Sequence, residues 1–127
     1  PLGGEKGCVS GIGVKKIMCD RGIAQILKDI AKEEYENVHS GIIATGDMFV
    51  SESLMCKKIG EEFDAKAVEM EGGSIAHVCL MNEVPCAVIR AISDNADDEG
   101  KVDFVNFAEK SAGKTQKVIS KALKRLM

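Results

Sequence analysis

The stretch Ala87-Val88-Ile89-Arg90-Ala91-Ile92-Ser93-Asp94 decides how the rest of the chain is interpreted. It is a nearly continuous apolar run, rich in β-branched residues, that follows Pro85 and stops at a hydroxyl and a carboxylate. Such a run is typical of a strand buried on both faces of a parallel sheet. Because ligands of open α/β sheets bind at the carboxyl ends of the strands, Asp94 is the first candidate for chemistry.

Two further segments combine a short apolar run with terminal acids. Residues 41–47 form an apolar strand closed by a glycine and Asp47, and residues 67–71 alternate apolar and acidic side chains. Alternation alone would turn Glu69 and Glu71 toward solvent, and that alternative stays open at this stage. If the three strands are parallel, their acids converge at one edge of the sheet.

Four helices are expected around these strands. Asp20 is the predicted N-cap of the first helix, because apolar residues recur after it at three-and-four spacing. The second covers residues 51–60, with Leu54, Met55 and Ile59 turned inward. The third covers residues 72–81 and buries Ile75, Val78 and Cys79. The fourth begins after an Asp103 cap and continues to the C-terminus.

Helices and strands alternate in this order, which predicts an α/β fold. We expect a three-layer sandwich with a mostly parallel sheet, consisting of a loop over residues 1–19 and a core over residues 20–127. The net charge of −3 and an aromatic content of 4% argue against nucleic-acid binding. No apolar run approaches the length of a membrane span and no signal peptide is visible, so we expect no membrane partner and a cytoplasmic location.

The cysteines and the acids restrict the chemistry further. Five widely spaced cysteines without a C-x-x-C pair indicate neither a disulfide framework nor a zinc site. Carboxylates without a nearby basic partner suit a ligand rich in hydroxyl groups and ring nitrogens better than a phosphorylated one. In a partly apolar pocket, one of several acids can keep its proton near neutral pH and serve as a general acid.

Taken together, four motifs resemble the C-terminal half of the 5′-methylthioadenosine/S-adenosylhomocysteine nucleosidases, which belong to the purine nucleoside phosphorylase superfamily. The resemblance extends in order, with sensible spacing, from about Asp20 to the C-terminus. The motifs are Gly46-Asp47-Met48-Phe49-Val50, Val68-Glu69-Met70-Glu71, Ile75-Ala76-His77-Val78 and Arg90-Ala91-Ile92-Ser93-Asp94-Asn95-Ala96-Asp97.

The resemblance implies hydrolysis of the bond between adenine and ribose, with no metal or organic cofactor, a purine nucleoside as the small-molecule partner, and a homodimer. It implies that Asp94 protonates the purine ring and that Glu71 binds the ribose hydroxyls. It further implies that Met70 packs on the sugar and that Phe49 stacks on adenine. The substrate-binding residues implied as a set are Phe49, Val50, Glu69, Met70, Glu71, Ser93 and Phe104.

The chain also departs from this family. Members are roughly twice as long, and their N-terminal half carries the first strands of the sheet and the glutamate that activates the attacking water. We therefore expect an incomplete half of the nucleoside phosphorylase fold that is inactive alone. Gly73 stands where the family leads us to expect alanine or threonine. Two alternatives remain. The first is a phosphorylase fragment, which is disfavoured because related hexameric phosphorylases follow the Ser-Asp pair with an arginine, whereas no arginine lies between Arg90 and Arg125 here. The second is a non-catalytic remnant that binds nucleosides or assists assembly.

Overall fold

The computed structural model describes residues 5–9, 11–50, 52–92 and 104–127 of the chain, with only the backbone for residues 104–108. Helices and strands alternate up to α3, as the sequence predicts. The elements in chain order are α1 (Arg21–Glu34), β1 (Ile42–Thr45), α2 (Ser53–Phe63), β2 (Ala65–Glu69), α3 (Gly72–Met81) and α4 (Phe104–Leu126).

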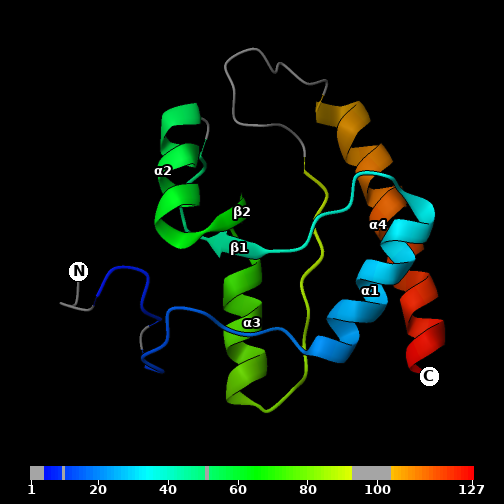
Figure 1. The fold of residues 1–127 in the computed structure, drawn as a ribbon, viewed down its shortest axis with the longest axis horizontal. Coiled ribbons are helices and arrows are strands. Elements are labelled where there is room, and N and C mark those ends of the chain that lie inside the picture. Colours follow the sequence, from blue (N-terminus) through cyan, green and yellow to red (C-terminus); the bar gives the residue numbers. More distant parts are fainter. Residues whose placement is uncertain (1–4, 10, 51, 93–103) are drawn as a thin grey trace.

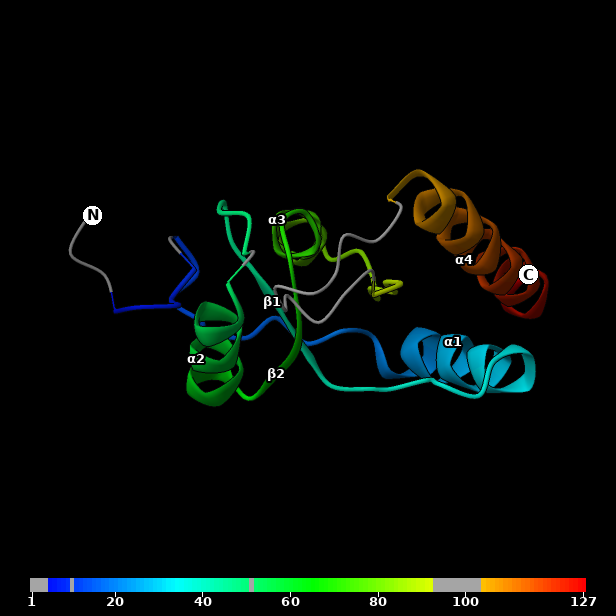
Figure 2. The ribbon, with the colours of Figure 1, turned by 90° about the horizontal axis from the view of Figure 1, so that it is seen from above.

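A parallel pair of strands lies at the centre of one half of the molecule. β1 pairs with β2 in a register that sets Ala44 opposite Val68 and Thr45 opposite Glu69. The crossover between them is α2, which ends at Asp64 in the left-handed conformation (φ 50°). α2 and α3 lie on opposite sides of the strand pair (Figures 1 and 2), which gives the helix–sheet–helix layering of an α/β fold.

α1 and α4 lie side by side at the other end of the molecule (Figures 1 and 2). The start of α1 confirms the predicted cap, because the Asp20 carboxylate accepts a hydrogen bond from the Ile23 N–H at 2.8 Å. The two helices share a small buried cluster of four residues. Its members are Ile30, Ala31, Val118 and Ala122.

Ion pairs join the polar sides of the same two helices. Glu34 of α1 contacts both Lys117 and Lys121 of α4, and Arg125 lies 2.8 Å from Glu33. These pairs connect residues about ninety positions apart in the sequence, so they fix how α4 lies along α1. Exposed pairs of this kind contribute little to stability individually, and the apolar cluster is the main source of cohesion.

The prediction of a doubly buried strand over residues 87–94 is wrong for its described part. Residues 87–92 form no strand pairing, and Ile92 is 57% exposed. The reason lies in what surrounds them: the Cys86 carbonyl accepts a hydrogen bond from the Asp20 N–H (2.7 Å), and Ile89 packs against the α1–α4 cluster. An apolar run forms a central strand only where neighbouring strands offer it a ladder.

Two predicted helix faces also differ from the structure. Leu54 of α2 is 62% exposed, and Ile75 and Val78 of α3 are exposed, although all three were expected to face inward. In α3 the buried positions are Gly72 and Ala76. α3 is apolar on every side, so spacing alone does not reveal which side meets the strands.

Candidate functional site

Glu69, the last residue of β2, is the centre of the described part of the site. Its carboxylate is buried and accepts hydrogen bonds from the Thr45 hydroxyl, from the Gly72 N–H (2.6 Å) and from the Glu71 N–H (3.0 Å). The solvent-facing alternative for Glu69 is thereby excluded. An acid at this place satisfies amides that have no partner within α3 and lies at the positive end of the helix dipole.

Thr45 connects the two strands to the start of α3. It stands opposite Glu69 in the register, donates its hydroxyl hydrogen to that carboxylate, and accepts a hydrogen bond from the Gly73 N–H at 2.8 Å. A Cβ at position 73 would lie 2.7 Å from the Thr45 Cβ, and one at position 72 would lie 3.0 Å from the Glu69 Oε1. The glycines therefore allow the helix to begin directly against the strand ends.

β2 ends two residues earlier than the sequence predicts, and this separates the two acids. Glu71 lies beyond the strand as the N-cap residue of α3, with its side chain 61% exposed. The Arg90 guanidinium lies 2.9 Å from the Glu71 Oε2 and 3.6 Å from the Glu69 Oε2. One buried and one open carboxylate thus share a single cation.

Arg90 corrects the expectation that the acids lack a basic partner. Sequence reasoning placed Arg90 in a motif but assigned it no role. A signal was available, because Arg90 is the one charged residue within the apolar run 87–92. A charge at such a position indicates a nearby acid, since an unpaired charge among apolar side chains is costly.

The protonation state of Glu69 follows from these contacts. Burial raises the pKa of Glu69, but hydrogen bonds from Thr45, Gly72 and Glu71, together with the Arg90 charge, more than offset that effect and hold the pKa below its ordinary value. Glu69 is therefore ionised at neutral pH. A proton donor for a leaving group has to be sought elsewhere in the site.

The structure describes some of the other predicted site residues fully, one by its backbone alone, and two not at all. Phe49 is 77% exposed just beyond β1, Val50 is half-buried, and Met70 is 40% exposed just beyond β2. Because the strands are parallel, the segments that carry these residues leave the same edge of the sheet as Glu71. Ser93 and Asp94 lie outside the described residues, and Phe104 is described only as the first residue of α4.

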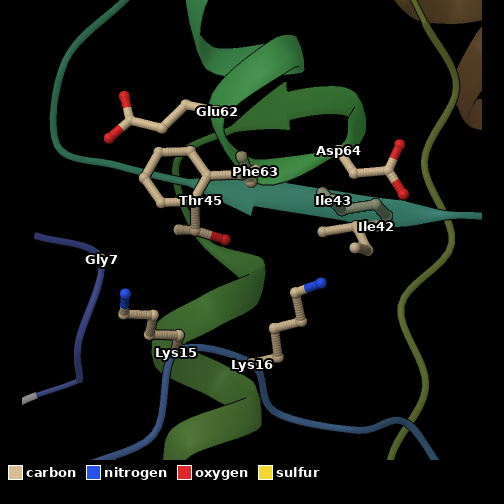
Figure 3. A pocket seen from close by; sticks show the side chains of 10 residues that line it. Gly7, Lys15, Lys16, Ile42, Ile43, Thr45, Glu62, Phe63 and Asp64 are labelled. Atoms are coloured by element: carbon tan, nitrogen blue, oxygen red, sulfur yellow. The ribbon is translucent and has the colours of Figure 1, made fainter.

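One hollow of the described surface lies away from these residues. It is a cavity of about 290 Å³ between the N-terminal segment, β1 and the end of α2, where Lys15 and Lys16 face Phe63, Glu62 and Asp64 (Figure 3). It shares only Thr45 with the network around Glu69. Its charges are of both signs, so it offers no field that selects an anion or a cation.

Metal-binding clusters and membrane-spanning helices are both absent from the described ranges. Within them, no three His, Cys, Asp or Glu side chains are grouped closely enough to hold a metal ion. None of the helices there is long and apolar enough to cross a bilayer. The hydrogen-bonded acids at the strand ends are thus the chemistry-bearing group that the described structure offers.

The family model and the most similar curated proteins indicate the same family for this chain. The sequence model of the phosphorylase superfamily matches residues 1–124. Aminodeoxyfutalosine nucleosidase of Helicobacter pylori is 43% identical over 101 residues, which are 80% of this chain and 44% of that protein. A 5′-methylthioadenosine/S-adenosylhomocysteine nucleosidase of an Exiguobacterium strain is 38% identical over 109 residues, 84% of this chain and 47% of that protein.

Solved structures agree with the sequence relatives. Futalosine hydrolase of Helicobacter pylori superposes with a TM-score of 0.76 at 39% identity, covering 86% of this chain and 47% of the other. S-adenosylhomocysteine nucleosidase of Streptococcus pyogenes, in complex with 5-methylthiotubericidin, gives a TM-score of 0.83 at 31% identity, covering 94% and 50%. The chain spans about half the length of these proteins. The resemblance stated from the motifs is confirmed, and similarity to futalosine nucleosidases is an addition to it.

Proposed function

Because the chain belongs to the phosphorylase superfamily, we propose that it supplies the ribose- and purine-binding half of an adenosine-type nucleosidase. The reaction is hydrolysis of the N-glycosidic bond of 5′-methylthioadenosine or S-adenosylhomocysteine, with release of adenine. The relatives carry nucleosidase names and are about twice as long. This chain by itself is proposed to be inactive, because the water-activating glutamate implied by the resemblance belongs to the half that it does not contain.

The observation that carries the proposal is the open Glu71 carboxylate held by Arg90 at the edge where the parallel strands end. A carboxylate there accepts hydrogen bonds from two neighbouring ribose hydroxyls. As the glycosidic bond lengthens, positive charge develops on the sugar, and a fixed negative group close to it stabilises that charge. The ion pair with Arg90 orients the Glu71 carboxylate.

Asp94 is the proposed general acid. Protonation of a purine ring nitrogen lets adenine leave as a neutral base, and Ser93 orients that acid. The ionised state of Glu69 supports a division of roles, because Glu69 is already committed to the start of α3. Phe49, Val50, Met70 and Phe104 complete the proposed pocket around the base and the sugar.

The test measures adenine release from 5′-methylthioadenosine by this chain co-expressed with the N-terminal half of the Helicobacter pylori relative, of which this chain covers 44% and whose other half the motifs of this chain resemble. We expect no release by the chain alone and release by the combination. Glu71→Gln should lower kcat/KM about 100-fold, and Asp94→Asn should lower it at least as much. Glu61→Gln, an exposed acid on α2, is the matched control and should leave the rate unchanged.

Two results would contradict the proposal. Full activity of the Asp94→Asn combination would remove Asp94 from the mechanism. Release that depends on inorganic phosphate and yields ribose 1-phosphate derivatives would favour the phosphorylase alternative over hydrolysis. Parallel assays with aminodeoxyfutalosine decide which 5′ substituent the site prefers, since relatives named for both substrates match the chain.

A further inference from the structure

Three of the five cysteines come together where α3 ends. Cys79 lies near the end of α3, Cys86 lies in the segment that follows, and Cys19 stands just before α1. All three are half-buried and carry free thiols. The remaining two, Cys8 and Cys56, lie in the N-terminal segment and in α2. The wide spacing of the cysteines along the sequence does not reveal this grouping.

Backbone hydrogen bonds fold the chain back after α3 and hold the three cysteines in one place. The Val84 N–H donates to the Cys79 carbonyl at 2.9 Å, which closes the turn after the helix. The Cys86 carbonyl accepts a hydrogen bond from the Asp20 N–H at 2.7 Å, and this contact brings Cys19 beside Cys86. Figure 1 shows the junction at the lower end of α3, where the segment after the helix passes the start of α1.

The thiols of Cys79 and Cys86 face one another. Burial raises the pKa of the Cys86 thiol, and the charge and hydrogen bond of the neighbouring Cys79 thiol raise it further, with a smaller contribution from Cys19. Cys86 therefore keeps its proton near neutral pH. Cys79 also lines a surface depression of about 300 Å³ on α3, where a small molecule in the solvent can reach it.

The chemistry open to this pair is thiol–disulfide exchange. Within the described ranges no three His, Cys, Asp or Glu side chains are placed to hold a metal ion, so the cysteines offer no metal site there. Two thiols that a fold holds side by side react with each other as if at high concentration, which favours an intramolecular disulfide over a mixed one.

We propose that Cys79 and Cys86 form a dithiol that low-molecular-weight disulfides, such as oxidised glutathione, convert into an intramolecular disulfide. The Cys79 thiolate attacks one sulfur of oxidised glutathione, which forms a mixed disulfide and releases one glutathione. Cys86 then loses its proton to solvent and attacks the Cys79 sulfur, and the second glutathione leaves. In total, two protein thiols are oxidised to one disulfide while one glutathione disulfide is reduced to two thiols.

The disulfide connects the end of α3 to the segment that carries Arg90. Glu71, the ion-pair partner of Arg90, is the N-cap residue at the other end of the same helix. Both sides of this ion pair therefore belong to elements that the disulfide joins. The inference rests on the cysteines alone and is independent of the proposed nucleosidase function.

The test equilibrates this chain with mixtures of oxidised and reduced glutathione, blocks the remaining thiols with N-ethylmaleimide, and analyses unreduced peptides by mass spectrometry. Glu83 lies between Cys79 and Cys86, so cleavage after glutamate gives two peptides that only the disulfide keeps together. We expect this linked pair, with an equilibrium constant about tenfold larger in the folded chain than in urea, because the fold holds the thiols together. Helical circular dichroism monitors the folded state.

Two variants and two contrary results complete the test. Cys86→Ser should abolish the linked pair, whereas Cys56→Ser, at a half-buried cysteine of α2, is the matched control and should retain it. A disulfide between Cys19 and Cys86 in place of the expected one would overturn the assignment of Cys79. Equal equilibrium constants with and without urea would show that the fold does not favour the bond. Neither result affects the proposed function, whose own test measures adenine release.

Discussion

At the scale of single residues, Glu69 and Glu71 show how two acids separated by one residue acquire different tasks. Glu69 is committed to the amides at the start of α3, whereas the Glu71 side chain is exposed and, among the described residues, is held by Arg90. Burial makes the difference, since a buried carboxylate has to satisfy its lone pairs with protein donors. The exposed acid is the one that a ligand can reach.

The close contact between Gly73 and Thr45 leads to a prediction. Gly73→Ala should lower the free energy of unfolding by about 1–3 kcal/mol, because the new methyl group would lie 2.7 Å from the Thr45 Cβ and would push α3 off the strand end. Urea unfolding followed by circular dichroism measures the change. The substitution also tests whether this chain tolerates alanine at position 73, where the family resemblance leads us to expect alanine or threonine.

The control for this substitution is Gly113→Ala in α4. A Cβ at position 113 meets nothing within 4 Å and Gly113 is exposed in mid-helix, so alanine should stabilise the chain by about 0.5–1 kcal/mol. If both substitutions shifted stability in the same direction, crowding against Thr45 would not be the cause.

At the scale of elements, α1 is fixed at its start by one side chain and along its length by α4. The Asp20 carboxylate caps the helix. The backbone N–H of Asp20 also donates a hydrogen bond to the carbonyl of Cys86, at the beginning of the segment that leads to Arg90. The start of α1 therefore helps to position a residue of the candidate site, although α1 itself lies at the far end of the molecule (Figure 1).

Removal of the Asp20 cap is expected to lower the stability of the chain. Asp20→Ala should lower the free energy of unfolding by about 1 kcal/mol, because the Ile23 N–H loses its acceptor. Asp20→Asn retains an equally good capping oxygen and should remain close to the original stability. Equal losses in the two variants, measured by urea unfolding, would show that the negative charge rather than the hydrogen bond matters.

At the scale of the whole molecule, the helices and strands form two groups. β1, β2, α2 and α3 form one group and α1 with α4 the other (Figure 2). Ile89, in the segment after α3, packs on the α1–α4 cluster and so connects the two groups. The described residues bury few apolar side chains, and the hydrogen-bonded and ion-paired acids Glu34 and Glu69 add to what that small apolar core contributes. The stability of the isolated chain should therefore respond strongly to pH.

Two carboxyl groups determine the direction of that response. Hydrogen bonds from Lys117 and Lys121 hold the pKa of Glu34 below its ordinary value, and the pKa of Glu69 is lowered as well. A group with a lowered pKa in the folded state stabilises the fold above its unfolded pKa of 4.5, and that contribution is lost as the pH falls toward the folded pKa. Stability should thus be highest above about pH 5 and decline below about pH 4.5.

The measurement is the free energy of urea unfolding between pH 7 and pH 3. The Glu34→Gln, Glu69→Gln double variant should be less stable at pH 7 and should show a shallower decline below pH 5. A decline as steep in the variant as in the original chain would assign the acid sensitivity to other groups.

The sequence by itself determined the local features and the family. The Asp20 cap, the bounds of α3, an acid close to the end of the second strand and the motifs of a nucleosidase were all visible, because a cap acts over three residues and strand and helix patterns repeat within a few. Tertiary structure decided which acid is buried, which cation faces the acids, which side of α3 meets the strands, and that residues 87–92 form no strand. Each of those depends on contacts among Thr45, Glu69 and Arg90, or on neighbouring strands, which lie far apart in the sequence. Burial and pairing are properties of the assembled surroundings, and local spacing does not contain them.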